Sequence, residues 1–336
     1  MSYKVLFVYR RQRDFGNFSI ENYFASISSK LSDRFEVNVW VSPYISNGIF
    51  KRLLSIISLW WYCKNRHFDI IHITGDVHFL VFAAPRRKVV LTIHDVGFLY
   101  QRGYLKKLFI NLFWLQLPCW YASKITCVSD STRQAILKSY IGRSINPIIV
   151  EVCIDDKFIL NSSKLPNSVF TILHIGTSYN KNLERLILAC SDIKCHLNIV
   201  GHLNVQQEKM LSNYSFSNFV NLEIEDLIKL YNSSDMLFFC STFEGFGMPI
   251  LEAQAVGIPV LTSNIIPMAD VAGVGAILVD PYCLLDIKNG ILAFKDSEYL
   301  RHKFVDLGVC NVSKYNPFII ASKYEDIYLT MHLSKM

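Results

Sequence analysis

Two carboxylates stand eight residues apart in the segment whose residue types are best suited to chemistry. Glu244 and Glu252 flank the run Gly245-Phe246-Gly247, which follows a short apolar segment ending at Cys240. Carboxylates accept hydrogen bonds from hydroxyl groups, so two of them in one crevice suit a ligand with several hydroxyls, such as a sugar or a ribose. We therefore predict that Glu244 and Glu252 bind a polyhydroxylated ligand.

The glycines between the carboxylates predict a turn that leads into a helix. Gly247 stands at the expected cap, Pro249 falls in the first helical turn, and Gly257 comes just after the expected end. Such a turn lets backbone amides approach a ligand closely. The partial positive charge of a helix N-terminus favours a phosphate or a polar sugar. The segment therefore predicts a site for a phosphate or for a polar sugar.

Short apolar runs and helical patterns alternate along the chain, and they indicate the elements that position this segment. Most of the runs are continuous and rich in β-branched or aromatic residues, which is typical of parallel strands buried on both faces. The expected strands are residues 5–9, 37–41, 70–73, 89–93, 125–128, 148–152, 170–175, 197–200, 236–240, 259–262 and 276–279. The expected helices are residues 19–31, 50–64, 104–121, 182–190, 226–232 and 248–256.

Two successive alternations of this kind predict an α/β protein with two doubly wound, Rossmann-like domains. A polar stretch at residues 155–168 suggests the boundary, so we expect domains at residues 1–158 and 168–316. The helical stretch at residues 317–333 is expected to cross back onto the first domain. Residues 1–160 carry a net charge of +10 and residues 161–336 a net charge of −4, which suggests different partners for the two domains.

The composition and the missing motifs exclude several classes of protein. The 336 residues are 51% hydrophobic and 18% charged, with a mean hydropathy of +0.26, which excludes disorder. No apolar run reaches the roughly 20 residues of a membrane span, and no signal peptide is expected. The nine scattered cysteines, without C-x-x-C, indicate a reducing cytosol. Neither G-x-G-x-x-G after the first strand nor a P-loop is present, which argues against nicotinamide cofactors and P-loop nucleotide binding.

The sequence E-G-F-G-M-P-I-L-E at residues 244–252 resembles the E-x7-E signature of retaining glycosyltransferases of family 4, which have the GT-B fold. The run from His174 to Asn182 is similar to the family's glycine turn, and segments around Glu21, His72 and His94 resemble bacterial surface-polysaccharide members. The resemblance covers nearly the whole chain. It implies two Rossmann-like domains that face each other across a cleft.

The resemblance also assigns roles to individual residues. Glu252 is expected to bind the donor ribose, Glu244 the transferred sugar, and Lys181 the diphosphate. His94 is expected to reach the sugar from the opposite domain. The remaining donor-binding residues would be Gly176, Thr177, Asn180, Gly245, Phe246, Gly247 and Met248. Asn180 stands where the family often has an arginine beside the lysine, so one cation is missing.

The chemistry of these residue types is consistent with glycosyl transfer. Cleavage of a sugar–phosphate bond leaves negative charge on the diphosphate, which Lys181 and the helix N-terminus after Gly247 would stabilise. Neither a metal nor a cofactor is expected, and Asp155-Asp156 is interpreted as a solvated pair at the domain boundary. Gly16 and His78 are weaker candidates on the acceptor side or the donor loop. A turn glycine or a buried structural histidine is the ordinary alternative at such positions.

The basic, aromatic segments of the first half suggest contact with an anionic membrane. Residues 49–68 and 104–121 interleave Lys and Arg with Trp, Phe, Leu and Ile, which is typical of interfacial helices. Core-facing helices with snorkelling cations are the alternative. Nucleic acid is a less favoured partner because no nucleic-acid-binding module accompanies the charge.

The sequence therefore predicts a retaining glycosyltransferase that moves a hexose or deoxyhexose from a GDP-, UDP- or dTDP-linked donor to a lipid-linked or other saccharide acceptor. The expected setting is bacterial surface-polysaccharide synthesis (O-antigen, capsule or exopolysaccharide), on the cytoplasmic face of the inner membrane. Two alternatives remain open: a sugar-nucleotide isomerase or epimerase on the same fold, and a non-catalytic, membrane-associated partner of a polysaccharide assembly complex.

Overall fold

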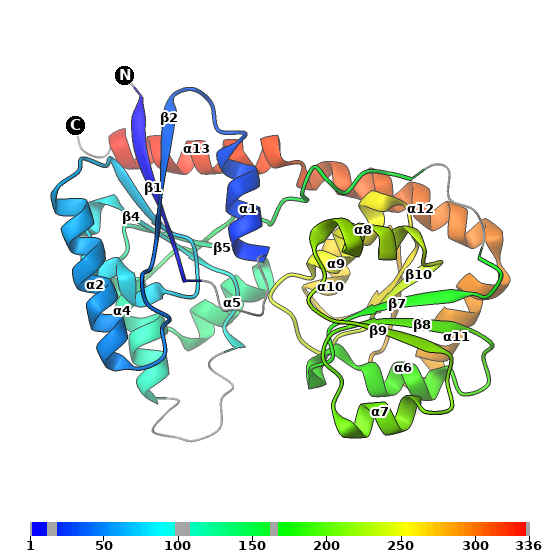
Figure 1. Ribbon diagram of the computed structural model, residues 1–336. Helices are drawn as coiled ribbons and strands as arrows, with labels where there is room; N and C mark the ends of the chain where they lie inside the picture. Colours follow the sequence, from blue (N-terminus) through cyan, green and yellow to red (C-terminus); the bar gives the residue numbers. More distant parts are fainter. Residues whose placement is uncertain (1, 12–18, 98–107, 162–166, 334–336) are drawn as a thin grey trace. The chain divides into compact units, whose positions relative to one another are not determined.

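The computed structural model describes residues 2–11, 19–97, 108–161 and 167–333. Tertiary contacts group the chain into two compact units (Figure 1). The N-terminal unit comprises residues 1–155 together with residues 317–336, and the C-terminal unit comprises residues 156–316. Each unit is built on its own parallel sheet of six strands, which confirms the predicted fold class.

The sheet of the N-terminal unit has the strand order β2-β1-β3-β4-β5-β6, and all of its pairs are parallel. The strand bounds are β1 Tyr3–Tyr9, β2 Phe35–Val41, β3 Ile70–Ile73, β4 Val89–Ile93, β5 Lys124–Cys127 and β6 Ile148–Ile149. Strands β3 and β4 are buried along their whole length, which explains their uninterrupted apolar sequences. The order reverses between β1 and β3, and in an open parallel sheet such a point is where ligands bind.

Helical segments cover both faces of this sheet: α1 Ser19–Ser28, α2 Ile49–Lys64, η1 His78–Ala83, η2 Arg86–Lys88, η4 Asn111–Gln116, α4 Leu117–Tyr121, α5 Asp130–Ser139 and α13 Pro317–Leu333. The C-terminal helix α13 belongs to this unit (Figure 1). His72 of β3 joins it to the sheet, because its Nδ1 lies 2.7 Å from the Tyr328 hydroxyl and its Nε2 lies 2.7 Å from Thr92 Oγ1.

The sheet of the C-terminal unit has the order β12-β11-β10-β7-β8-β9, again with parallel pairs only. Its strands are β7 Thr171–Ile175, β8 His196–Val200, β9 Phe216–Phe219, β10 Met236–Phe239, β11 Val260–Ser263 and β12 Ala276–Val279. Its helical segments are η5 Tyr179–Lys181, α6 Leu183–Ala189, α7 Val205–Leu211, α8 Ile224–Asn232, α9 Met248–Val256, α10 Met268–Ala272, α11 Leu284–Asp296, α12 Glu298–Val312 and η6 Ser313–Tyr315. The order reverses between β7 and β10.

The structure differs from the predicted elements in several places, and the helices α7, α10, α11 and α12 were not predicted. The short strand β9 was not predicted because its sequence, Phe-Ser-Asn-Phe, is half polar, as suits a strand at the sheet edge. Within the predicted helix at residues 104–121, residues 111–116 form a π-helical turn, and residues 104–107 lie outside the described residues. In the described part of the chain, no helix is long and apolar enough to cross a membrane.

Candidate active site

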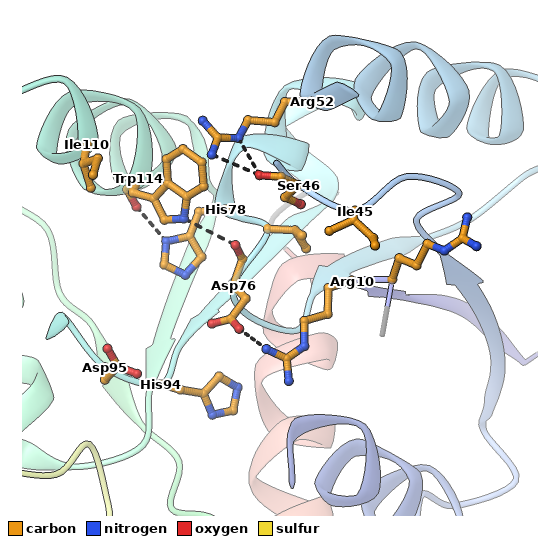
Figure 2. Close-up of a pocket in the computed structure, with 12 residues that line it drawn as sticks. Arg10, Ile45, Ser46, Arg52, Asp76, His78, His94, Asp95, Ile110 and Trp114 are labelled. Atoms are coloured by element: carbon orange, nitrogen blue, oxygen red, sulfur yellow. Dashed lines mark hydrogen bonds and ion pairs between the residues drawn. The ribbon is translucent and has the colours of Figure 1, made fainter. Parts of the chain in front are cut away.

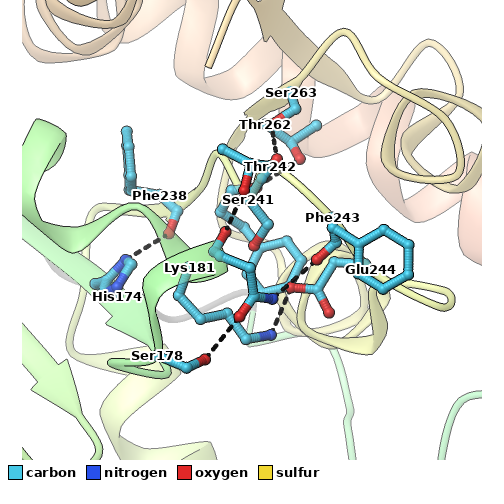
Figure 3. A network of polar contacts seen from close by, with 12 residues as sticks. His174, Ser178, Lys181, Phe238, Ser241, Thr242, Phe243, Glu244, Thr262 and Ser263 are labelled. Carbon is cyan, nitrogen blue, oxygen red and sulfur yellow. Dashed lines mark hydrogen bonds and ion pairs between the residues drawn. The ribbon is translucent and has the colours of Figure 1, made fainter. Parts of the chain in front are cut away.

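Lys181 and Glu244 meet where the strand order of the C-terminal unit reverses. Lys181 ends the short turn η5 that follows β7, and Glu244 lies in the loop that follows the neighbouring strand β10. The Lys181 Nζ lies 2.6 Å from Glu244 Oε1, and both side chains are mostly buried (Figure 3). Two residues 63 positions apart are thus joined in one ion pair at the carboxyl ends of adjacent strands.

Gly176 leaves the space in which the Lys181 side chain lies. It follows β7 with φ +93°, a conformation that favours glycine. A Cβ at this position would stand 2.8 Å from Lys181 Cγ and 2.9 Å from Lys181 Cε. The ammonium group also lies 4.7 Å from the centre of the Phe239 ring, a cation–π contact. Gly176 therefore positions the lysine through close packing.

Asn180 joins the turn that contains Lys181 to the loop that contains Glu244 through hydrogen bonds. Its Nδ2 donates to the Phe243 carbonyl at 2.9 Å, and its backbone carbonyl accepts from Thr242 N at 2.8 Å. Ser178 Oγ donates to Asn180 Oδ1 at 2.8 Å. An amide can donate to a carbonyl and accept from a hydroxyl at once, whereas an arginine has no acceptor. The asparagine at this position therefore holds the two loops together.

Asn182 is a positioning residue to which sequence reasoning assigned no role, although it ends the run that resembles the family's glycine turn. It is buried, has φ +66°, and donates through Nδ2 to the carbonyls of Cys240 (2.9 Å) and Pro281 (2.8 Å). Those bonds tie the start of α6 to the ends of β10 and β12. The signal available in the sequence was the residue type, because asparagine tolerates the left-handed conformation better than most residues.

The helix α9 begins at Met248, as predicted, directly after the loop that contains Glu244. Gly247 caps it with φ +111°, Met248 and Pro249 open its first turn, and Gly257 ends it with φ +82°. Beside Gly245 in the same loop, the Phe246 ring is buried, with its centre 5.9 Å from that of Tyr315. The first turn of α9 therefore presents backbone N–H groups close in sequence to Glu244.

Glu252 and Thr177 make contacts of their own. The Tyr231 hydroxyl donates to Glu252 Oε2 at 2.7 Å, and burial, together with the Glu252 charge, raises the pKa of Tyr231 well above its ordinary value. Thr177 Oγ1 donates to the His202 carbonyl at 2.6 Å. The structure thus joins Lys181 with Glu244 and gives Glu252 a tyrosine partner.

His94 lies in the N-terminal unit, at the carboxyl end of β4. Its Nε2 is 2.7 Å from the Thr74 carbonyl, and a Cβ on Gly75 would stand 2.5 Å from its Cδ2. Because a carbonyl only accepts, Nε2 carries the proton and Nδ1 is an acceptor in the neutral ring. Burial lowers the pKa of His94, which favours that neutral form. His94 is therefore suited to accept a hydrogen bond from a hydroxyl.

A cavity of about 370 Å³ lies beside His94 at the carboxyl ends of the strands of this unit (Figure 2). It is lined by Arg10, Arg11, Ile45, Ser46, Arg52, Asp76, Val77, His78, His94, Asp95, Ile110 and Trp114. His78 is buried, its Nδ1 lies 2.6 Å from the Trp114 carbonyl, and burial lowers its pKa. Gly16 lies outside the described residues. Within the described ranges, no three His, Cys, Asp or Glu side chains cluster as metal ligands.

Two family models match successive parts of the chain. The model of glycosyl transferases group 1 matches residues 155–308, and that of glycosyltransferase family 4 matches residues 21–150. The chain belongs to glycosyltransferase family 4. This assignment favours group transfer over the isomerase and non-catalytic alternatives, and it confirms the resemblance inferred from residues 244–252.

Named relatives and solved structures agree with this assignment. The glycosyltransferase is 25% identical over 276 residues to the capsular polysaccharide biosynthesis glycosyltransferase CapM of Staphylococcus aureus, covering 74% of this chain and 72% of CapM. It is 42% identical over 57 residues to O-antigen chain mannosyltransferase B of Escherichia coli, which covers 17% of this chain and only 15% of that relative. The structure of Anabaena Alr3699/HepE, solved with UDP and glucose, superposes with a TM-score of 0.77 at 16% identity, covering 99% of this chain and 100% of HepE. That likeness supports the GT-B fold.

Proposed function

We propose that this glycosyltransferase moves a hexose or deoxyhexose from a nucleotide sugar to a lipid-linked saccharide, with retention of the anomeric configuration, in surface-polysaccharide synthesis. The observation that carries the proposal is the Lys181–Glu244 ion pair at the switch point between β7 and β10, beside the start of α9. The site combines a cation, helical N–H groups and a carboxylate. Those groups match a sugar diphosphate.

The reaction breaks the bond between the anomeric carbon and the diphosphate oxygen, and it forms a bond from the acceptor oxygen to that carbon. The acceptor proton leaves with the nucleoside diphosphate. In this proposal Lys181 turns from Glu244 to the diphosphate and stabilises its growing negative charge. Glu244 is then released to accept hydrogen bonds from the sugar hydroxyls, and Glu252 binds the ribose. Neutral His94 accepts a hydrogen bond from the transferred sugar, and no metal or cofactor is needed.

The donor is identified by testing a panel of nucleotide sugars. Relatives are named as mannosyltransferases, and one solved neighbour is a complex with UDP-glucose, so the panel spans GDP-, UDP- and dTDP-sugars. A donor at 100 times its Kd stabilises the protein by about 2.7 kcal/mol, which a thermal shift detects. We expect one donor class to raise the Tm of the native chain, and Lys181→Ala to abolish that shift. A native chain that binds none of the donors would refute the proposal.

The outer face of α2 supports peripheral binding to an anionic membrane. Phe50, Leu53, Ile57, Trp60 and Trp61 follow helical spacing and are each 46–72% exposed; we call them the α2 stripe. The helix contains no Asp or Glu, and its Lys51 and Lys64 are exposed. Apolar and aromatic side chains flanked by cations are the features of a helix that lies in a lipid interface. We therefore propose that the α2 stripe docks the enzyme on the cytoplasmic face of the inner membrane.

Co-sedimentation with vesicles tests this docking. We expect the native chain to bind vesicles with an anionic lipid fraction, and the double variant Trp60→Ser, Trp61→Ser to lose most of that binding. Tyr299→Ser is the matched control, because Tyr299 is 74% exposed on α12 in the other unit. Equal binding by the native chain and the double variant would show that the α2 stripe does not contact lipid.

A further inference from the structure

The cavity beside His94 contains two cations that no carboxylate of the described residues neutralises. Arg10 is paired with Asp76 and Glu21. Arg11 and Arg52 also line the cavity, and neither forms an ion pair with a carboxylate of the described residues. Arg11 donates through one Nη to the Pro43 carbonyl at 2.5 Å. The lining therefore offers two guanidinium groups to an anionic ligand that enters the cavity.

Arg52 is held in a fixed orientation toward this cavity. Its Nε and one Nη donate to the Ser46 carbonyl at 3.2 and 3.1 Å, and its guanidinium lies 4.3 Å from the Trp114 ring centre (Figure 2). Trp114 is fixed in turn, since its Nε1 donates to the Asp76 carbonyl at 3.3 Å. A stacked guanidinium keeps N–H groups at its edge, and such a fork matches the oxygens of a phosphoryl or carboxylate group.

The electrostatics of α2 favour an anion at the same place. Lys51 and Arg52 stand in the first turn of this helix, where the backbone N–H groups already carry partial positive charge, and no acidic residue accompanies them. Burial lowers the pKa of Arg52, because it disfavours the charged guanidinium. An oxyanion in the cavity would reduce the repulsion among these positive charges. It would also stabilise the charged form of Arg52, which burial disfavours.

We propose that Arg52 and Arg11 bind the phosphoryl group that joins the acceptor saccharide to its lipid, so that the enzyme extends a sugar close to the lipid. This inference rests on the proposed function and names its acceptor more closely. Arg52 stands between Phe50 and Leu53 of the α2 stripe, so one turn of α2 faces both lipid and cavity. A lipid-borne phosphoryl group lies where the chain leaves the bilayer, whereas a carboxylate within the saccharide has no such reason to lie beside the stripe.

A binding experiment tests the subsite without any transfer. Geranyl diphosphate is titrated by calorimetry into the full-length Lys181→Ala variant, in which the proposed donor site does not compete for the probe. Loss of a hydrogen bond to a charged group weakens binding by about 10- to 100-fold, so we expect Arg52→Gln and Arg11→Gln, each added to Lys181→Ala, to show losses of that size. Arg34→Gln is the matched control, because Arg34 is exposed in the same unit and lies outside the cavity lining.

The probes separate the possible sources of the anion. We expect geranyl diphosphate to bind more tightly than inorganic pyrophosphate or glucuronate. Pyrophosphate binding as tight as geranyl diphosphate would overturn the lipid-borne source, and tighter binding of glucuronate would overturn the phosphoryl group. Unchanged geranyl diphosphate binding in both arginine variants would overturn the subsite itself. Arg11 is exposed, so its substitution leaves the fold intact and keeps the test valid if Arg52→Gln unfolds the unit.

A kinetic measurement separates the subsite from the proposed function. With an active donor, we expect Arg52→Gln to raise KM about 10- to 100-fold for a lipid-diphosphate saccharide and to leave KM unchanged for an alkyl glycoside with the same terminal sugar. An equal rise for both acceptors would show that Arg52 only supports the fold. If no donor supports transfer, the proposed function fails, and the calorimetry still decides on the subsite.

Discussion

At the scale of single residues, the site of the C-terminal unit is built around the Lys181–Glu244 salt bridge, which the proposed mechanism rearranges. Lys181 and Glu244 are 19% and 14% exposed, and they neutralise each other at 2.6 Å. A mostly buried charge that loses its partner keeps its desolvation cost without compensation. Each member of the pair therefore depends on the other to offset the cost of its own burial.

A double-mutant cycle measures this dependence. We expect Lys181→Met and Glu244→Gln each to lower the free energy of unfolding of the C-terminal unit by about 1–3 kcal/mol. We expect the double variant to lose less than the sum, because it leaves no unpaired charge. Urea unfolding followed by circular dichroism gives the three values. Strictly additive losses would show that the pair contributes no coupling energy.

Gly176→Ala tests whether close packing positions the lysine. The substitution strains a backbone at φ +93° and places a Cβ 2.8 Å from Lys181 Cγ. We expect about a 100-fold loss in kcat, the size typical of losing one donor to a developing anion. Gly48→Ala is the control, because it has φ +107° but nothing within 4 Å of the added Cβ. If both alanine variants change donor affinity and kcat to the same extent, backbone strain alone explains the effect.

At the scale of elements, the strands could be predicted better than the contacts between loops. Continuous apolar runs such as Ile70–Ile73 and Val89–Ile93 have the predicted bounds, since burial on both faces leaves a plain signal. The helix α5, Asp130–Ser139, was missed because Ser and Thr also favour turns. Its cap is Ser129, whose hydroxyl accepts from Thr132 N at 3.1 Å.

The site shows the same limit of sequence reasoning. Lys181 and Glu244 could be named from their motifs, but their ion pair depends on β7 and β10 being neighbours, which is a property of strand order. The bonds of Asn180 and Asn182 to backbone carbonyls follow from loop conformation. Arg52 and Trp114 stack although they are 62 positions apart. Such contacts leave no local pattern in the sequence.

We expect the contact between β3 and α13 to make the stability of the N-terminal unit depend on pH. His72 is fully buried, and burial lowers its pKa to about 3, against an ordinary value near 6.5. Between these values the unfolded chain binds a proton that the native chain excludes. The free energy of unfolding therefore falls as the pH falls through this window, by about 1.4 kcal/mol per pH unit from this group.

Tryptophan fluorescence follows the unfolding of the N-terminal unit, because all five tryptophans lie in residues 40–120. Below pH 6.5, we expect His72→Gln to reduce the slope of the free energy of unfolding against pH by the contribution of one proton, about 1.4 kcal/mol per pH unit. His67→Gln is the control, since the His67 side chain is 75% exposed. A His72→Gln slope equal to that of the native chain would assign the acid sensitivity to other groups.

At the scale of the whole molecule, the two halves carry opposite net charges, +10 in residues 1–160 and −4 in residues 161–336. If the positive half meets an anionic bilayer, added salt weakens that contact, because the Debye length falls from about 10 Å at 0.1 M to about 3 Å at 1 M. We expect raised salt to release the chain from anionic vesicles while the apolar α2 stripe retains a residual affinity. Vesicle binding that is independent of salt would leave the charge difference without a role at the membrane.

The central claim is retaining transfer from a nucleotide sugar at the Lys181–Glu244 site, and NMR of the complete reaction tests it most directly. The native chain is incubated with the donor that it binds and a lipid-diphosphate saccharide. We predict that the donor is consumed only when the acceptor is present, that the new linkage keeps the donor's anomeric configuration, and that Lys181→Ala slows the reaction about 100-fold or more. Inversion at the anomeric carbon, consumption of the donor without an acceptor, or full activity of Lys181→Ala would contradict the account.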